Sequence, residues 1–236
     1  MNIFKLEVIN LRYNLIELFS KLCSKYNLHN CEFIMAGHAT IIKSDYYANK
    51  YYILTNKQML NSIDYNHYLY YHSLMRTNWV WSNGKLKFRT IFPVENYLNL
   101  IYTLLITNNI DKSDDILEYM HITLEHEVGH IIHISNDYNK YFAKKDITFE
   151  AIQEWCKRHN TDKELQKYYK DYNQLYQQFE NEEITEDDYI DKKTRLYFNM
   201  PSEKAANKAI DLDIEKLIKL NMKYLTSIED SLCDIN

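Results

Sequence analysis

Apolar residues in the first part of the chain recur at helical spacing. Between residues 3 and 26 this stripe contains Phe4, Val8, Leu11, Leu15, Leu18, Phe19 and Leu22. Residues three, four or seven positions apart share one face of an α-helix, so the stretch predicts an amphipathic helix. After about residue 31 the spacing changes, and short segments rich in β-branched and aromatic residues lie at 32–35, 40–42 and 51–55. Such segments, separated by polar turns, are typical of strands.

A β-hairpin is the clearest element of this region. In WVWSNGKLKFRTIF, at residues 79–92, alternating apolar and polar residues flank Asn83-Gly84. Asn-Gly is favoured in two-residue hairpin turns because both turn residues need a positive φ. Pro93 ends the second strand, and residues 94–107 return to helical spacing. We therefore expect an antiparallel sheet followed by a helix.

The pattern stays helical after a polar break that ends near residue 112. A helix is expected from residue 113 to about residue 134. Its buried face is predicted to contain Ile116, Met120, Leu124, Val128 and Ile131. A last major helix is expected to start at Pro201-Ser202 and to face inward with Ala206, Ile210, Ile214 and Leu217.

Residues 147–199 are also helical in pattern but much more polar. Thr161-Asp-Lys-Glu164 has the form of a capping box, and Thr185-Glu-Asp-Asp188 is a weaker version. Two antiparallel helices separated near Asn181 are therefore predicted. Their charged, tyrosine-rich surface is either a solvent-exposed face of the protein or a binding site for a partner. The pattern alone favours the solvent-exposed face.

Together these elements indicate an α+β fold. We expect a small antiparallel sheet in the first part of the chain and a predominantly helical C-terminal half. We expect residues 1–92 to form the N-terminal helix and sheet. Residues 93–135 and 200–236 are expected to form a helical core, into which residues 136–199 are inserted as a helical hairpin.

Composition narrows the classes of partner. The chain has 236 residues, 46% of them hydrophobic and 26% charged, and its net charge is −5. This is the composition of an ordinary globular protein, which excludes collagen-like, disordered and disulfide-scaffold classes. Because the chain is mildly acidic, it has no general attraction for phosphate backbones, and no nucleic-acid partner is expected.

The distribution of cysteines and apolar segments predicts the compartment. Four cysteines lie far apart along the chain and form no Cys-x-x-Cys pair. The simplest interpretation is that all four are reduced thiols. Charged residues interrupt the N-terminal helix, so it lacks the apolar region of a signal peptide. The most apolar stretch, 97–107, is too short to span a bilayer. We expect a cytoplasmic protein without membrane contact, in the host cytoplasm if the Asn-, Ile-, Lys- and Tyr-rich chain is encoded by a virus or phage.

The chemistry of the chain is concentrated in the helix at 113–134. It contains His126-Glu127-Val128-Gly129-His130, an H-E-x-x-H motif. Positions i and i+4 lie one turn apart on one helix face, so both imidazoles can bind one metal ion with the glutamate beside its water. The alternative is a helix whose histidines are surface residues or satisfied core groups. These residues border an apolar stripe, where a charged group is unfavourable unless it binds a metal or forms a hydrogen bond. This favours the metal site.

A catalytic zinc usually has three protein ligands, so a third must be found. Metzincin spacing fails, because His133 stands at the glycine position and Asn136 at that of the last histidine. His133 is seven residues from His126, about 10.5 Å along the helix axis, so it cannot share the ion with the other two histidines. It is expected to be a surface histidine or to touch substrate.

Glu203 in PSEKAANKAID is the preferred third ligand. It lies in the first turn of a helix and shares a face with Ala206, and Asn207 follows. Ala206 and Ala209 are small enough to let this helix approach the metal helix closely, and Asn207 is placed to orient a ligand histidine by a hydrogen bond. Alternatively, Glu203 only favours the helix N-terminus electrostatically. Glu150 and Glu154 are lesser competitors as ligands.

The two motifs together resemble zincin metallopeptidases of the gluzincin type. The segment from Glu203 to Asn207 is similar to the E-x-x-A-N segment of phage-associated and ImmA/IrrE-like metallopeptidases. The resemblance covers residues 85–135 and 200–220 and implies a zincin-like fold, in which a small antiparallel sheet packs on the metal-binding helix. In that fold the edge strand of the sheet binds an extended peptide, for which residues 85–91 are the candidate.

The resemblance implies hydrolysis of peptide bonds by one Zn²⁺ held by His126, His130 and Glu203. Zinc would activate water, and Glu127 would act as general base toward a peptide or protein substrate. Tyr197, His133 and Tyr138 are candidates to stabilise the oxyanion. Two alternatives stay open: a catalytically inactive zincin-like module that binds metal or protein, and a metal-free helical adaptor that uses the polar insertion. A retained Glu127 favours the enzyme, because a structural site needs no general base.

Overall fold

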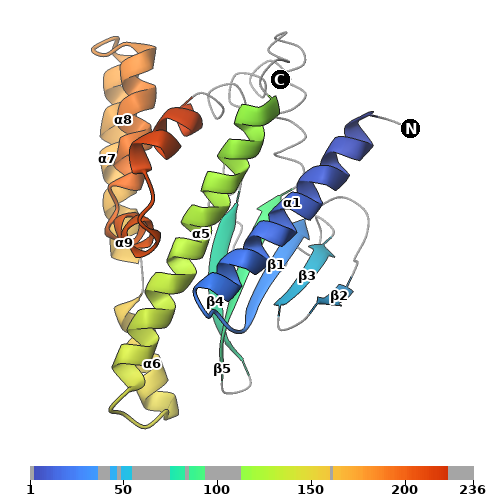
Figure 1. The fold of residues 1–236 in the computed structure, drawn as a ribbon. Coiled ribbons are helices and arrows are strands. Elements are labelled where there is room, and N and C mark those ends of the chain that lie inside the picture. Colours follow the sequence, from blue (N-terminus) through green and yellow to red (C-terminus); the bar gives the residue numbers. More distant parts are fainter. Residues whose placement is uncertain are drawn as a thin grey trace.

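The structure is a computed structural model that describes residues 3–36, 43–46, 49–54, 75–82, 85–93, 113–159 and 162–222. Two long helices lie on one face of a sheet, and a group of shorter helices lies against the second of them (Figure 1). The described elements are α1 (Ile3–Lys25), β1 (Cys31–Ala36), β2 (Lys43–Tyr46), β3 (Asn49–Leu54), β4 (Arg76–Ser82), β5 (Lys85–Pro93), α5 (Ser113–Phe142), α6 (Phe149–Arg158), α7 (Asp162–Glu180), α8 (Glu186–Phe198) and α9 (Pro201–Ile210). The α+β class is therefore confirmed.

The sheet is mixed, and the prediction of an antiparallel sheet is wrong. Its five strands have the order β2-β3-β1-β5-β4. Central β1 pairs in parallel with both β3 and β5, whereas the outer strands β2 and β4 are antiparallel to their neighbours. The hairpin signal specifies only strands that follow each other along the chain. It carries no information on the non-consecutive pairs, which are the parallel ones.

The predicted hairpin is confirmed by the register of β4 and β5. Ser82 pairs with Lys85, which leaves two residues for the turn, although Asn83 and Gly84 themselves lie outside the described residues. The interior position of β5, between β1 and β4, corrects a second expectation. Residues 85–91 are not an edge strand, because the hairpin folds its first strand, β4, to the outside.

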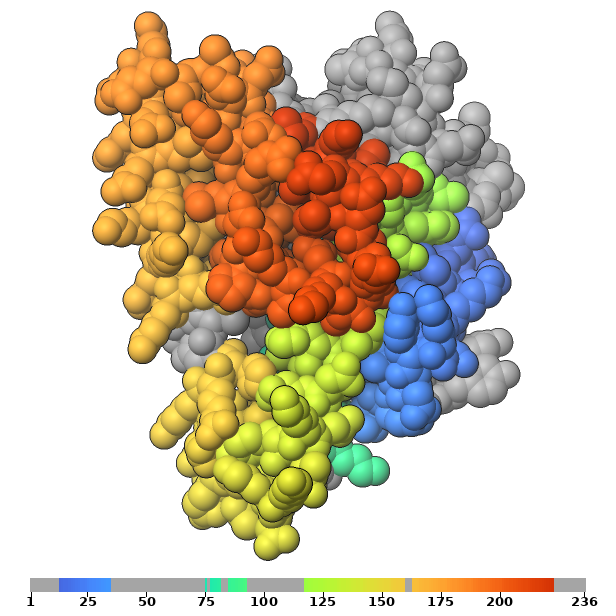
Figure 2. All heavy atoms as spheres, turned by 60° about the vertical axis from the view of Figure 1, so that its left-hand side comes forward, coloured from blue at the N-terminus to red at the C-terminus, as the bar shows by residue number. Residues whose placement is uncertain are grey.

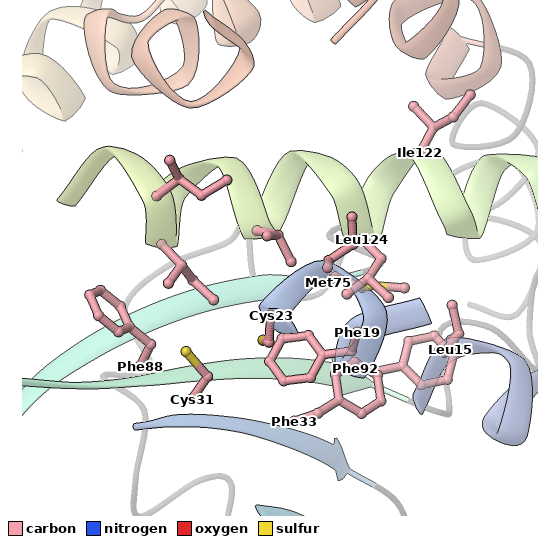
Figure 3. Close-up of a cluster of buried hydrophobic side chains, with 14 of the residues drawn as sticks. Leu15, Phe19, Cys23, Cys31, Phe33, Met75, Phe88, Phe92, Ile122 and Leu124 are labelled. Carbon is pink, nitrogen blue, oxygen red and sulfur yellow. The ribbon is translucent and has the colours of Figure 1, made fainter. Parts of the chain in front are cut away.

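The main core lies between the sheet and the two long helices. Figure 3 shows Leu15, Phe19 and Cys23 of α1 meeting Phe33, Phe88 and Phe92 of the strands under α5. The ring centroids of Phe19 and Phe33 are 5.4 Å apart. Leu124 of α5 points into this cluster, whereas Ile122 points away from the sheet. Both sides of α5 are therefore covered, one by the sheet and one by the C-terminal helices.

α5 is longer than predicted, and the last predicted helix is broken. Met120, Leu124, Val128 and Ile131 are buried as expected. α9 ends at Ile210, and its C-cap residue Asp211 has a left-handed φ of 56°. Residues 214–222 form a separate helix. Aspartate adopts this conformation more readily than most residues do, but it is a weaker stop signal than glycine. Figure 2 shows α9 and the helix that follows it lying over the middle of α5.

α7 and α8 form the predicted helical hairpin, but the polar segment also contains a further helix, α6, which was not predicted separately. The hydroxyl of Thr185 accepts a hydrogen bond from the Asp188 amide, so Thr185 caps α8 as predicted. Buried Tyr168, Leu175 and Tyr189 close the space between the helices. The proposed division of the chain into an N-terminal part, a core and an insertion stays a prediction, and α5 extends past its boundary at residue 135.

Several predictions lie outside the described residues. These are the strand at 40–42, the helix at 94–107 and the cap at Thr161. Among the helices that the structure describes, none combines the length and the apolar character needed to cross a membrane.

Candidate metal centre

α5 carries the two histidines of the H-E-x-x-H motif on the side that faces α9. His126 is 4% exposed, and the imidazole of His130, one turn later, is about four-fifths buried. Their Nε2 atoms are 3.2 Å apart. Helical spacing alone produces this pair, as the sequence predicted.

α9 adds the carboxylate of Glu203, which is 6% exposed. Its Oε2 lies 2.9 Å from Nε2 of His126 and 3.3 Å from Nε2 of His130. Two ligand atoms on a tetrahedral zinc ion, with bonds of about 2.0–2.1 Å, are about 3.3 Å apart. The three donor atoms therefore have nearly the spacing of one face of a zinc tetrahedron. No other three metal-ligating side chains in the described ranges bring their donor atoms together in this way.

Asn207, one turn after Glu203, fixes the orientation of His126. Its Oδ1 lies 2.7 Å from Nδ1 of His126. A carbonyl oxygen only accepts hydrogen bonds, so Nδ1 of His126 carries a hydrogen, and Nε2 is the ring atom that faces the carboxylate of Glu203. A histidine binds a metal ion through a deprotonated ring nitrogen, and this orientation leaves Nε2 of His126 available for that role. The donor set therefore fits a metal ion.

The electrostatics of the metal-free site lead to the same conclusion. Burial alone would lower the pKa of His130, but the negative charges of Glu203, Glu127 and Glu164 raise it to about 9. Burial alone would raise the pKa of Glu203, but the two imidazoles hold it well below its usual range. Without a metal, the raised pKa of His130 favours a protonated imidazole beside the Glu203 carboxylate. The buried carboxylate is therefore paired with positive charge, either an imidazolium or a metal ion.

Gly129 lets α9 approach α5 closely enough to deliver Glu203. A β-carbon at this position would lie 2.4 Å from the carbonyl oxygen of Ala206. Ala206 itself is fully buried against α5. The sequence predicted the close approach from the small residues of α9, but it missed the role of Gly129. The available signal was a glycine inside a helix, which is unfavourable unless packing requires it.

Glu127 is buried beside the donor atoms but does not belong to them. It is 6% exposed, and its charge acts on His130. Its backbone carbonyl accepts a hydrogen bond of 3.3 Å from the hydroxyl of Thr77 in β4. That hydroxyl in turn lies 2.9 Å from the hydroxyl of Thr90 in β5. Glu127 is therefore held at the junction of the metal helix and the outer strand β4.

The remaining candidates fall into distinct surroundings. His133 faces His159, whose Nε2 is 2.8 Å from Oδ2 of Asp137. Burial, His159 and His130 lower the pKa of His133, against the opposite effect of Asp137. Tyr138 packs on Trp81 and Trp155, and burial raises its pKa. This places Tyr138 in an aromatic cluster rather than beside the donor atoms.

Tyr197 lies closer to the metal centre. Its ring contacts Phe198, whose own ring packs edge-on against the imidazole of His126 at 5.7 Å. Glu150 and Glu154, the competitors for the third ligand position, are both exposed. Glu154 pairs with Arg158 at 2.6 Å and with Lys145 at 3.7 Å. Neither glutamate takes part in the group formed by His126, His130 and Glu203.

Comparison with known proteins assigns no family to the chain. No family model matches it, and neither a curated protein nor a solved structure is significantly similar to it. The resemblance to gluzincins thus rests on the two motifs and on the geometry that brings them together.

Proposed function

We propose that the protein is a zinc-dependent peptidase of the gluzincin type. The observation that supports this most directly is the arrival of Glu203 from α9 at 2.9 Å and 3.3 Å from the two motif histidines. Two imidazoles and one carboxylate, with a further position open, form a common ligand set of catalytic zinc. A bound zinc ion would supply Lewis acidity toward a peptide carbonyl and toward water.

Glu127 is the general base in this proposal. It follows His126 directly and is buried, so its carboxylate is shielded from bulk water. It takes a proton from the attacking water and later passes it to the leaving amine. A purely structural metal site has no use for such a residue. The buried carboxylate therefore favours the enzyme over an inactive metal-binding module.

The outer strand β4 is the proposed binding site for the substrate. Among the described strands it pairs only with β5, and we place an extended peptide along its other edge. The hydrogen bond from Thr77 to the carbonyl of Glu127 fixes this strand next to the metal helix. A peptide added to β4 would lie along the same side of α5, which supports a peptide or protein substrate.

The test is cleavage of a peptide library, with new termini identified by mass spectrometry. We expect cleavage by the zinc-loaded protein, loss of cleavage after chelation and return of cleavage when zinc is added back. His130→Ala should abolish cleavage. His121→Ala should retain it, because His121 lies on the same helix but outside the donor group. A zinc-loaded wild-type protein that cleaves nothing in the library would contradict the peptidase and favour a metal-binding module.

A further inference from the structure

The helix that supplies Glu203 begins without a cap of its own. Met200 occupies the N-cap position of α9 and makes no side-chain hydrogen bond to the helix. The first turn of an α-helix has amide groups that find no partner within the helix. Pro201 has no amide hydrogen, so the amide of Ser202 is the first one that requires an acceptor.

Glu164 of α7 supplies this acceptor from a distant part of the chain. Its Oε1 accepts the hydrogen bond of the Ser202 amide at 2.7 Å, across 38 residues. A carboxylate is favourable at this position because the helix N-terminus carries partial positive charge. Ser202 immediately precedes Glu203, so the contact is made one residue before the proposed metal ligand.

The second helix of the hairpin, α8, also reaches the metal centre. Phe198, the last residue of α8, packs edge-on against the imidazole of His126. Tyr197 beside it contacts Tyr168 of α7, with ring centroids 6.1 Å apart. Figure 1 shows α9 beside the hairpin formed by α7 and α8. The start of α7 and the end of α8 therefore both reach the surroundings of the donor atoms.

Glu164 is half-buried, so its hydrogen bond with the Ser202 amide is partly shielded from solvent. Glu164 belongs to neither α5 nor α9, the two helices that carry the donor atoms. It nevertheless contacts the first turn of α9, which orients Glu203. These observations give Glu164 a role that a solvent-exposed glutamate of the insertion would not have.

We propose that Glu164 is a positioning residue that fixes the first turn of α9 and so holds Glu203 on the metal ion. Through this contact the α7–α8 hairpin sets the affinity of the metal site. The inference rests on the metal site of the proposed function. A partner that displaces the start of α7 would weaken metal binding without touching any of the donor residues.

The test compares the zinc affinities of variants at Glu164. The variants separate the length of the side chain, which brings the acceptor to Ser202, from its charge. Glu164→Asp keeps the charge but withdraws the acceptor from Ser202, whereas Glu164→Gln keeps an acceptor at the same reach. We expect Glu164→Asp and Glu164→Ala to raise the Kd for zinc about 10–100-fold, as loss of a residue that orients a ligand does. Glu164→Gln should recover most of the affinity. Competition with a chromophoric chelator measures the Kd, and the visible spectrum of the Co²⁺ form reports ligand geometry.

Glu180→Ala is the matched control, because Glu180 is an exposed carboxylate at the far end of the same helix. It should leave both the zinc Kd and the Co²⁺ spectrum unchanged. A zinc-binding wild type whose Glu164→Ala and Glu164→Asp variants bind zinc equally well would overturn this inference alone. Equal weakening by Glu180→Ala would overturn it too, in favour of a general charge effect. A wild type that binds no zinc would overturn the metal site itself.

Discussion

Glu127→Gln is expected to lower the rate of peptide hydrolysis by about 10²–10⁴-fold, which is the range for loss of a general base. The amide has nearly the same shape as the carboxylate but does not accept a proton from water. Because Glu127 is not one of the three donor side chains, zinc should remain bound. The measurement combines initial cleavage rates with zinc content per chain for the same preparation.

A matched variant separates this effect from a general loss of charge on α5. Glu125 lies two residues earlier, and its charge acts on His121 and Lys216. Glu125→Gln should therefore cleave at the wild-type rate. Wild-type cleavage by Glu127→Gln would exclude Glu127 as the base. Loss of zinc together with activity would assign Glu127 a role in holding the metal instead.

Gly129→Ala is expected to destabilise the protein and to weaken zinc binding together. The new methyl group would lie 2.4 Å from the Ala206 carbonyl oxygen and 2.9 Å from its carbonyl carbon. Relief of this overlap moves α9 away from α5, at a cost of about 1–3 kcal/mol for overpacking. The same movement carries Glu203 away from the histidines. Ligand positions matter to about 0.5 Å, so we expect the Kd for zinc to rise at least tenfold.

The sign of the change in the free energy of unfolding distinguishes the steric contact from the effect of helix propensity. Alanine favours a helix over glycine by about 1 kcal/mol, so without the contact the substitution would stabilise the protein. Asn136→Ala, at an exposed position of the same helix, controls for helix propensity and should leave zinc binding unchanged. Chemical denaturation of the metal-free proteins gives the free energies of unfolding. A Gly129→Ala variant that is more stable than the wild type and binds zinc equally well would contradict the close approach of α9.

The sequence predicted those parts of the fold that depend on local spacing. The i and i+4 histidines, the hairpin around Asn83-Gly84 and the cap at Thr185 all follow from residues within one turn of each other. Glu203 could also be predicted as the third ligand, because few helix faces combine a carboxylate with small residues. The pairing of strands that are distant in the sequence could not be predicted. Nothing local specifies that β1 pairs in parallel with β3 and β5, or that β4 becomes the outer strand.

The parts of the site that the sequence missed are contacts between distant elements. Gly129 stood inside the motif, but its purpose becomes clear only when the backbone of Ala206 lies against it. Glu164 was interpreted as part of a local capping box at the start of α7. Thr161 of that box lies outside the described residues, but in the structure the carboxylate of Glu164 caps α9, where Met200 provides no side-chain cap. A charged residue near a helix start identifies a capping group, but not the helix that it caps.

The central claim is that His126, His130 and Glu203 bind one metal ion, and metal content per chain tests it most directly. Protein purified without added metal should contain about one zinc per chain, or take up one when zinc is supplied. His126→Ala and Glu203→Ala should lose it, whereas His121→Ala and Glu180→Ala should keep it. A wild-type protein that takes up no metal even when zinc is supplied, or variants at His126 and Glu203 that retain it, would contradict the site.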